Sequence, residues 1–162
     1  MMQRTSFDQM QCPVARSLDR VGEWWSILIL RDAFYGLTRF DQFAQSLGIA
    51  PNMLTRRLKA LCEAGLMERR LYQERPARYA YVLTDRGRDF RPVLWTLFAW
   101  GNRHLAPEGE SVSLVDPETG LPVDPVVIDR CTGRPLSDGV HVVAGPAASP
   151  RLQRRFERQT AL

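Results

Sequence analysis

The sequence predicts a mainly α fold of the α+β class: a helix-turn-helix with a β-hairpin wing, a long C-terminal dimerisation helix and a small β-rich C-terminal extension. Three observations predict it. Residues 38–65 read as two amphipathic helices joined by a short turn that contains glycine. Two strand-like runs with a charged connector follow. A long apolar helix then precedes a segment dominated by Pro, Gly, Asp and Val.

The N-terminal part predicts two helices in front of the helix-turn-helix. Residues 1–11 are polar and are expected to be a flexible N-terminus. Cys12 and Pro13 then begin a helix to about residue 21, because proline suits a first helical turn. Residues 23–35 are apolar nearly all round the first two turns, which predicts a buried helix at the centre of the domain. Its two adjacent tryptophans could line a ligand pocket, but aromatic side chains in so apolar a helix are more often core.

The first helix of the helix-turn-helix is expected over residues 38–47. Thr38 is predicted to cap it, with Asp41 as its acidic companion three residues later. Gly48 should end this helix in the left-handed conformation, and Ile49 should close the turn. The chain then leads directly into the second helix.

The second helix, about residues 51–64, is the candidate recognition helix. On a helical wheel Leu54, Leu58 and Leu61 share one face. The opposite face mixes short polar and basic side chains: Asn52, Thr55, Arg56 and Lys59. Such side chains hydrogen-bond base edges and pair with phosphates. A solvated amphipathic helix has the same pattern, so the DNA-binding interpretation depends on the turn before it and the hairpin after it.

Residues 66–72 and 79–83 are predicted strands, and the connector at about 73–78 is the predicted wing. Arg75 and Arg78 flank a proline in this connector. They could lie against a phosphate strand or enter the minor groove. A charged loop that only keeps the hairpin soluble would have the same composition.

A long helix is predicted from its cap, Thr84, to about Leu105. Pro92 should kink it, because proline removes a backbone donor and crowds the preceding turn. The helix carries a broad apolar stripe: Phe90, Val93, Leu94, Leu97, Phe98 and Gly101. The helix-turn-helix already has its own interior, so we predict that part of this stripe pairs with the same helix of a second subunit.

The remaining residues differ in composition from the rest of the chain. Residues 106–150 form the predicted β-rich extension, in which 115–123 and 128–136 resemble each other and each place a Thr-Gly turn between short apolar stretches. The extension is either an acidic appendage packed on the core or the dimer partner, or an effector or protein-contact site. Residues 151–162 are a basic C-terminal tail, either a short helix or a loose segment.

Charge is unevenly distributed along the chain. Residues 1–105 hold 16 Lys and Arg against 10 Asp and Glu, whereas residues 106–162 hold 6 against 8. The positive field therefore belongs to the part that contains the helix-turn-helix, which suits a polyanionic partner such as double-stranded DNA.

Several classes of protein are not indicated. There is no apolar run of about 20 residues and no signal-peptide core, so we expect a cytoplasmic protein without membrane contact. Three widely spaced cysteines favour neither a disulfide framework nor a zinc site. The only histidines, His104 and His141, have no motif partner, and no phosphate loop or nucleophile elbow occurs. We expect no enzyme, no cofactor and no metal.

An ordered set of motifs between residues 12 and 105 resembles the HxlR-type family of bacterial winged helix-turn-helix regulators. The set comprises Cys12-Pro13-Val14, the WWSILILR helix, Arg39-Phe40, Leu47-Gly48-Ile49, Leu54-Thr55-Arg56-Arg57-Leu58-Lys59, Glu63-Ala64-Gly65-Leu66, Tyr81-Val82-Leu83-Thr84 and the last helix with Trp100. The resemblance implies a homodimer that binds a near-palindromic operator and dimerises through its first and last long helices. The family more often has serine where Ala50 stands, so the start of the recognition helix should be weaker by about 1 kcal/mol.

The candidate DNA-binding residues are therefore Arg39, Asn52, Thr55, Arg56, Arg57, Lys59, Arg75 and Arg78. In several family members a cysteine at the position of Cys12 senses oxidants or electrophiles, which makes Cys12 a candidate redox sensor for an oxidant or small-molecule effector. A helix start favours a thiolate, but a small apolar residue also suits this position. A purely structural role for Cys12 therefore stays open as the alternative. Cys62 is expected in the core, and Cys131 is a candidate resolving thiol. The alternative function is a winged-helix protein-interaction module without operator binding.

Overall fold

A computed structural model describes residues 7, 9–136 and 140–160. Residues 1–6 and 8 of the expected flexible N-terminus and residues 161–162 of the basic tail lie outside the described residues. The chain divides into two compact units, Met1–Trp24 with Ser137–Leu162 and Trp25–Leu136. These units do not follow the boundaries predicted from the sequence, which stay predictions.

The secondary structure confirms the α+β fold class. The larger unit holds a two-stranded antiparallel sheet among helices, in the order expected for a winged helix-turn-helix. Its elements are α2 (Trp24–Phe34), α3 (Phe40–Leu47), α4 (Pro51–Glu63), β1 (Met67–Gln73), β2 (Arg78–Leu83), α5 (Asp85–Arg88) and α6 (Arg91–Leu105). The other unit holds α1 (Pro13–Val21) and α7 (Pro150–Thr160), so the basic tail forms a helix. No helix within the described ranges is long and apolar enough to cross a membrane.

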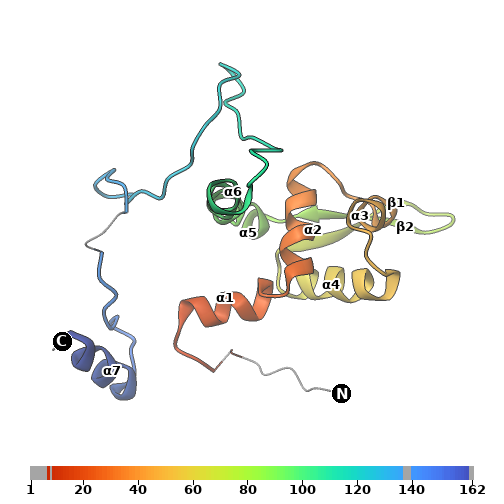
Figure 1. The fold of residues 1–162 in the computed structure, drawn as a ribbon. Helices are drawn as coiled ribbons and strands as arrows, with labels where there is room; N and C mark the ends of the chain where they lie inside the picture. The colour runs from red at the N-terminus through yellow and green to blue at the C-terminus, as the bar shows by residue number, and fades with distance from the viewer. Residues whose placement is uncertain (1–6, 8, 137–139, 161–162) are drawn as a thin grey trace. The chain divides into compact units, whose positions relative to one another are not determined.

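The core of the larger unit lies between the helix-turn-helix and the sheet. Figure 1 shows α3 and α4 beside the hairpin, with α4 contacting β1 and α3 contacting both α4 and β2. Fully buried apolar side chains come from α2, α3, α4 and β1: Ile29, Leu30, Phe43, Leu54, Leu58, Leu61 and Met67. The register pairs Met67 with Leu83, so the apolar ends of both strands lie at the base of the hairpin.

Helix α2 is buried along one face only. Ser26, Ile29 and Leu30 are buried, whereas Trp24 is 74% exposed and Trp25 is half-buried. Trp24 is two residues before Ser26, which places it on the opposite side of the helix. The prediction of a central buried helix is therefore right for Ile29 and Leu30 and wrong for Trp24.

The N-cap of helix α3 lies one residue later than the sequence indicated. Arg39 is the N-cap, and the Gln42 side-chain oxygen accepts the backbone N–H groups of Thr38 (3.1 Å) and Arg39 (2.9 Å). The Thr38 carbonyl oxygen instead accepts the N–H of Tyr81 at 2.7 Å. The prediction that Thr38 caps this helix is wrong, because its backbone pairs with β2 and a glutamine three residues after the N-cap supplies the cap.

The predicted kinked helix is two helices. Thr84 caps α5, as predicted, by accepting the Gly87 N–H at 3.1 Å, but α5 ends at Arg88. Helix α6 starts at Arg91 with Pro92 in its first turn. A first-turn proline needs no backbone donor, so the chain interrupts the helix before Pro92 rather than bending around it.

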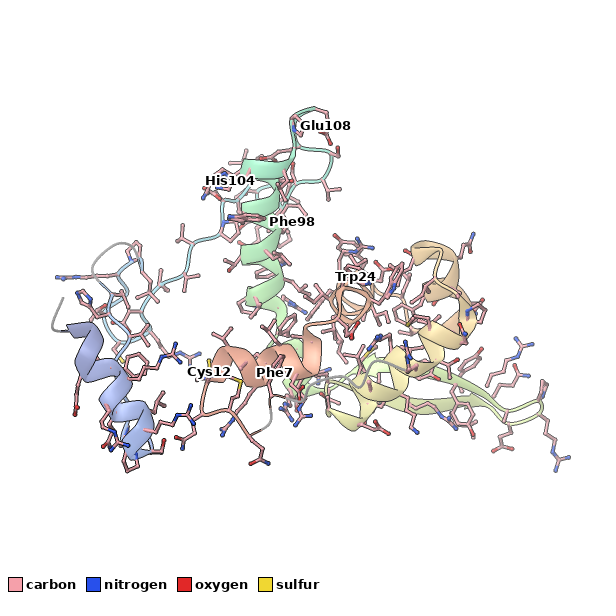
Figure 2. The ribbon with its side chains drawn as sticks, turned by 60° about the horizontal axis from the view of Figure 1, so that its bottom comes forward. Phe7, Cys12, Trp24, Phe98, His104 and Glu108 are labelled. Atoms are coloured by element: carbon pink, nitrogen blue, oxygen red, sulfur yellow. The ribbon has the colours of Figure 1, made fainter. Side chains whose placement is uncertain are left out.

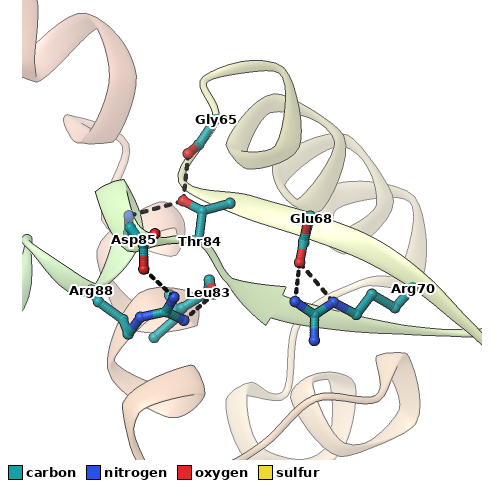
Figure 3. A network of polar contacts seen from close by, with 8 residues as sticks. Gly65, Glu68, Arg70, Leu83, Thr84, Asp85 and Arg88 are labelled. Atoms are coloured by element: carbon teal, nitrogen blue, oxygen red, sulfur yellow. Dashed lines mark hydrogen bonds and ion pairs between the residues drawn. The ribbon is translucent and has the colours of Figure 1, made fainter.

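The junction between hairpin and α5 is held by a compact polar network (Figure 3). The Thr84 hydroxyl donates to the Gly65 carbonyl at 2.6 Å, and the Thr84 N–H donates to the Leu66 carbonyl at 3.1 Å. Arg88 donates to the Leu83 carbonyl at 2.6 Å and pairs with Asp85. The end of α4, both ends of the hairpin and α5 thereby share one set of bonds.

The extension forms two similar turns rather than paired strands. Repeats 115–123 and 128–136 are each closed by one isolated β-bridge, Val115 to Pro122 and Ile128 to Pro135. An aspartate opens each turn: Asp116 accepts the N–H groups of Glu118 and Thr119, and Asp129 those of Cys131 and Thr132. Hydrogen bonds to its carboxylate lower the pKa of each aspartate. The weak sequence repeat is thus a repeated aspartate-headed turn.

Gly87→Ala tests the tight contact at the base of the hairpin. A Cβ on Gly87 would lie 2.0 Å from the Leu66 carbonyl oxygen, so the substitution must displace the backbone. We expect the free energy of unfolding to fall by about 1–3 kcal/mol in chemical denaturation. The matched control is Gly101→Ala in α6, where an added Cβ meets no atom within 4 Å and stability should stay constant or rise slightly. Equal stability of the two variants would contradict this packing.

Candidate nucleic-acid interface

The turn of the helix-turn-helix leads into α4 without a side-chain cap at the start of that helix. Gly48 ends α3 in the left-handed conformation (φ 59°), and Ile49 is only 5% exposed. Ala50 is the N-cap of α4 and makes no side-chain cap hydrogen bond, as predicted, and Pro51 is its first residue. Without a cap, the orientation of α4 is set by packing rather than by its first turn.

That packing divides α4 into a buried and an exposed face. Leu54, Leu58 and Leu61 are 0% exposed. Full burial of a leucine side chain contributes about 2 kcal/mol, so the three together hold the helix strongly in one rotation. The outward residues predicted from the wheel are all exposed: Asn52, Thr55, Arg56 and Lys59.

The two short polar side chains of this face bond to the first turn of α4. The Asn52 side-chain oxygen accepts the Met53 N–H at 2.7 Å, and the Thr55 hydroxyl donates to the Pro51 carbonyl at 2.8 Å. These bonds leave the Asn52 amide NH2 donors and the Thr55 oxygen lone pairs for a ligand. The face can therefore both donate hydrogen bonds and accept them.

The two long basic side chains are only loosely held. A guanidinium nitrogen of Arg56 lies 3.1 Å from the Met53 sulfur. Lys59 forms an ion pair with Glu63 at 3.7 Å, and both side chains are largely exposed, at 76% and 66%. An exposed pair of this kind contributes at most about 1 kcal/mol, so a stronger anion could displace Glu63.

Arg57 differs from the other predicted contact residues. Its side chain is 8% exposed and lies among the buried residues of α4. The structure does not place Arg57 where it could reach a phosphate from the outward face. Arg57 follows Leu54 by three residues and precedes Leu61 by four, which puts it on the leucine side of the helix.

The hairpin extends beyond α3 and α4 and ends in a basic tip (Figure 1). Arg75 and Arg78 are exposed at this tip, as predicted. The Gln73 side chain donates to the Arg75 carbonyl at 3.1 Å across the start of the turn. Arg39, also exposed, forms a β-bridge with Ala80, so this predicted contact residue lies beside the hairpin.

Arg69 in β1 is a further basic side chain of the hairpin, and it was not among the predicted contact residues. The Arg69 guanidinium lies 3.6 Å from the centre of the Tyr79 ring, within cation–π range. Arg69 is opposite Tyr81 in the register, so Tyr79 is its diagonal neighbour across the strands. An arginine and a tyrosine in facing strand runs were the sequence signal for this pair.

The three cysteines occupy different environments. Cys12 is the half-buried N-cap of α1 (Figure 2), and Cys131 is exposed in the second turn of the extension. Cys62 is half-buried rather than core, and burial raises the pKa of its thiol against the opposing effect of Arg69. Because the thiolate is the reactive form, Cys62 is a poor nucleophile.

His104 lies beside an aromatic ring, and the described part of the chain holds no group of side chains that could bind a metal. The His104 ring lies 5.6 Å from that of Trp100 near the end of α6 (Figure 2). Among the described residues, no group of three His, Cys, Asp or Glu side chains could hold a metal ion.

Comparison with known proteins gives consistent results. Rv3095 of Mycobacterium tuberculosis (strain ATCC 25618 / H37Rv), named an uncharacterized HTH-type transcriptional regulator, is 43% identical over 141 residues, which are 86% of this chain and 89% of that protein. The solved structure of the transcription-factor candidate PA1374 from Pseudomonas aeruginosa is 58% identical, with a TM-score of 0.63, and covers 89% of this chain and 99% of its own. PA1607, also a transcription-factor candidate, is 43% identical, with a TM-score of 0.77 and coverage of 86% and 99%.

A further solved structure has a stated regulatory chemistry. The redox regulator HypR in its reduced form is 30% identical to this chain, with a TM-score of 0.55, and covers 60% of this chain and 99% of its own.

Residues 20–109, more than half of the chain, match the family described as HxlR-like helix-turn-helix. With its winged fold, its two-faced α4 and these relatives, the chain belongs to the HxlR-like helix-turn-helix family of transcriptional regulators.

Proposed function

We propose that this regulator is a homodimer that binds a near-palindromic operator in double-stranded DNA, with α4 in the major groove and the β1–β2 hairpin as wing. The observation that carries the proposal is the division of α4, whose leucines are fully buried while its polar and basic side chains are exposed. An α-helix fits the major groove, where each base pair presents a distinct pattern of donors and acceptors.

The contacts divide by chemistry. Asn52, Thr55, Arg56 and Lys59 contact base edges and nearby phosphates from the major groove. Arg39, Arg75 and Arg78 contact the sugar-phosphate backbone from the hairpin side, where all three are exposed. Arg57 is not included because its side chain is buried.

Support for a dimer comes from α6. Leu94, Leu97 and Phe98 of its apolar stripe line a pocket with residues of α2, and Leu94 and Phe98 are half-buried. Val93, Leu97 and Trp100 are nevertheless 53%, 48% and 50% exposed. These last three recur at i, i+4 and i+7, which forms one continuous helix face. A two-fold pairing of this face would repeat the α4 surface and explain a near-palindromic site.

Cys12 is the proposed oxidant sensor. It begins α1, a helix that the family resemblance assigns to dimerisation, and the residue is half-buried. The similarity to the redox regulator HypR supports this assignment. Oxidation of Cys12 would then change the affinity for DNA through the dimer rather than through α4.

The assigned α4 face is tested by Arg56→Ala/Lys59→Ala. An electrophoretic shift on the upstream region of the protein's own gene should show specific affinity reduced at least about tenfold, because base and phosphate contacts are both lost.

The charge-matched control is Arg130→Ala/Arg134→Ala, which removes two exposed arginines of the extension and should leave affinity nearly unchanged. The salt dependence of binding should be steep for wild type and shallower for the α4 variant. Unchanged specific binding of the α4 variant would show that the face is wrongly assigned, and salt-independent binding would favour a protein-interaction module.

Cys12→Ser tests the sensor. With hydrogen peroxide as oxidant, wild type should change its operator affinity, and the variant should keep the affinity of the reduced protein. Cys131→Ser is the control: a retained response assigns sensing to Cys12 alone, and a lost response adds Cys131 as resolving thiol. An oxidant response that persists unaltered in Cys12→Ser would remove Cys12 from this role.

A further inference from the structure

A pocket of about 1010 Å³ adjoins Cys12 within the smaller unit. Its walls come from the two ends of the sequence: residues 9–12 and α1 on one side, and the start of α7 on the other. We call it the Cys12 pocket. Its size lies at the upper end of the range of about 300–1,000 Å³ for small-molecule sites.

The two walls are joined by one amide side chain. Gln11 donates from its side-chain nitrogen to the Ala147 carbonyl (3.3 Å) and accepts the Ser149 N–H at its oxygen (2.9 Å). These bonds connect positions 136 and 138 residues apart in the sequence. Since Cys12 follows Gln11 and α7 begins at Pro150, the bonds place the first turn of α7 at the thiol's side of the pocket.

The α7 wall is basic. Arg151, Arg154 and Arg155 all line the pocket, and none forms an ion pair with another described residue. Their spacing of i, i+3 and i+4 puts them on one side of the helix. Like-charged guanidinium groups on one side of a helix repel one another, and an anion between them relieves the repulsion while accepting several hydrogen bonds.

We propose that the Cys12 pocket binds a small anionic molecule whose carboxylate or phosphate groups pair with Arg151, Arg154 and Arg155 beside the Cys12 thiol. A small molecule fits better than duplex DNA because the arginines line a concave surface together with Met10 and Leu152. The inference does not depend on operator binding, so it stands or fails separately from the proposed function.

The thiol allows the pocket's charge preference to be measured directly. In the reaction with an aromatic disulfide, the Cys12 thiolate attacks one sulfur, a mixed disulfide forms and the other half leaves as a thiolate. Two such reagents differ in charge: 5,5′-dithiobis(2-nitrobenzoate) carries two carboxylates, and 4,4′-dithiodipyridine is neutral. The Cys131→Ser background removes the exposed competing thiol, and peptide mass spectrometry assigns the product to Cys12 or Cys62.

The experiment compares Arg151→Gln/Arg154→Gln with two controls in that background. We expect the Cys12 rate with the anionic reagent to fall about three- to tenfold, because electrostatic attraction of a charged reagent is lost, while the rate with the neutral reagent changes less than about twofold. Arg130→Gln/Arg134→Gln has the same net charge change outside the pocket and should keep both rates. Arg151→Lys/Arg154→Lys keeps the charge and should retain most of the anionic rate. Citrate should compete with the anionic reagent and slow its reaction with Cys12 in the protein that keeps Arg151 and Arg154, and it should not slow the neutral reagent. Sodium chloride at the same ionic strength is the control.

Three results would overturn the proposal. Equal rates with the anionic reagent in wild type and the glutamine variant would show that the arginines attract no anion to this pocket. Equal slowing with both reagents would show that they only maintain its shape. Unchanged reagent selectivity together with weaker operator binding would assign Arg151 and Arg154 to DNA instead.

Discussion

Burial of the three α4 leucines is the constraint on which the proposed DNA-binding surface depends. Leu54, Leu58 and Leu61 have no exposed surface, whereas the N-cap of the same helix offers no side-chain bond. The rotation of α4 about its axis is therefore set by the hydrophobic core. Once that rotation is fixed, the period of the helix directs Asn52 and Arg56 outward. The face available to DNA is a consequence of packing on its other side.

A second constraint sets where the wing lies relative to α4. Thr84 bonds to Gly65 and Leu66, which follow the C-cap of α4, and it also caps α5. The hairpin therefore starts and ends at one polar network (Figure 3). Arg39 adds a bridge from the start of α3 to Ala80 in β2. The recognition helix and the wing are thus joined at the hairpin base, while the wing tip with Arg75 and Arg78 extends free of that network.

Sequence periodicity was sufficient for the parts of the fold that a single helix or strand determines. The α4 leucines, Gly48 and the two strands follow directly from spacing and turn chemistry. Thr38 was misassigned because its partner, Tyr81, is distant in the sequence. Arg57 is only 8% exposed, because the long apolar stem of an arginine can be buried although its head is charged, and its predicted contact with DNA stays a prediction. The Cys12 pocket could not be predicted, since it depends on contacts between the two ends of the chain.

These constraints support the proposal of a two-fold DNA-binding dimer that pairs through the exposed side of α6. The most direct test of that account is hydroxyl-radical footprinting on the promoter upstream of the protein's own gene. Two protected half-sites of related, inverted sequence, separated by about 34 Å or a multiple of it, are the predicted result. Protection of a single half-site, or uniform protection without sequence preference, would contradict a two-fold dimer that reads DNA through α4.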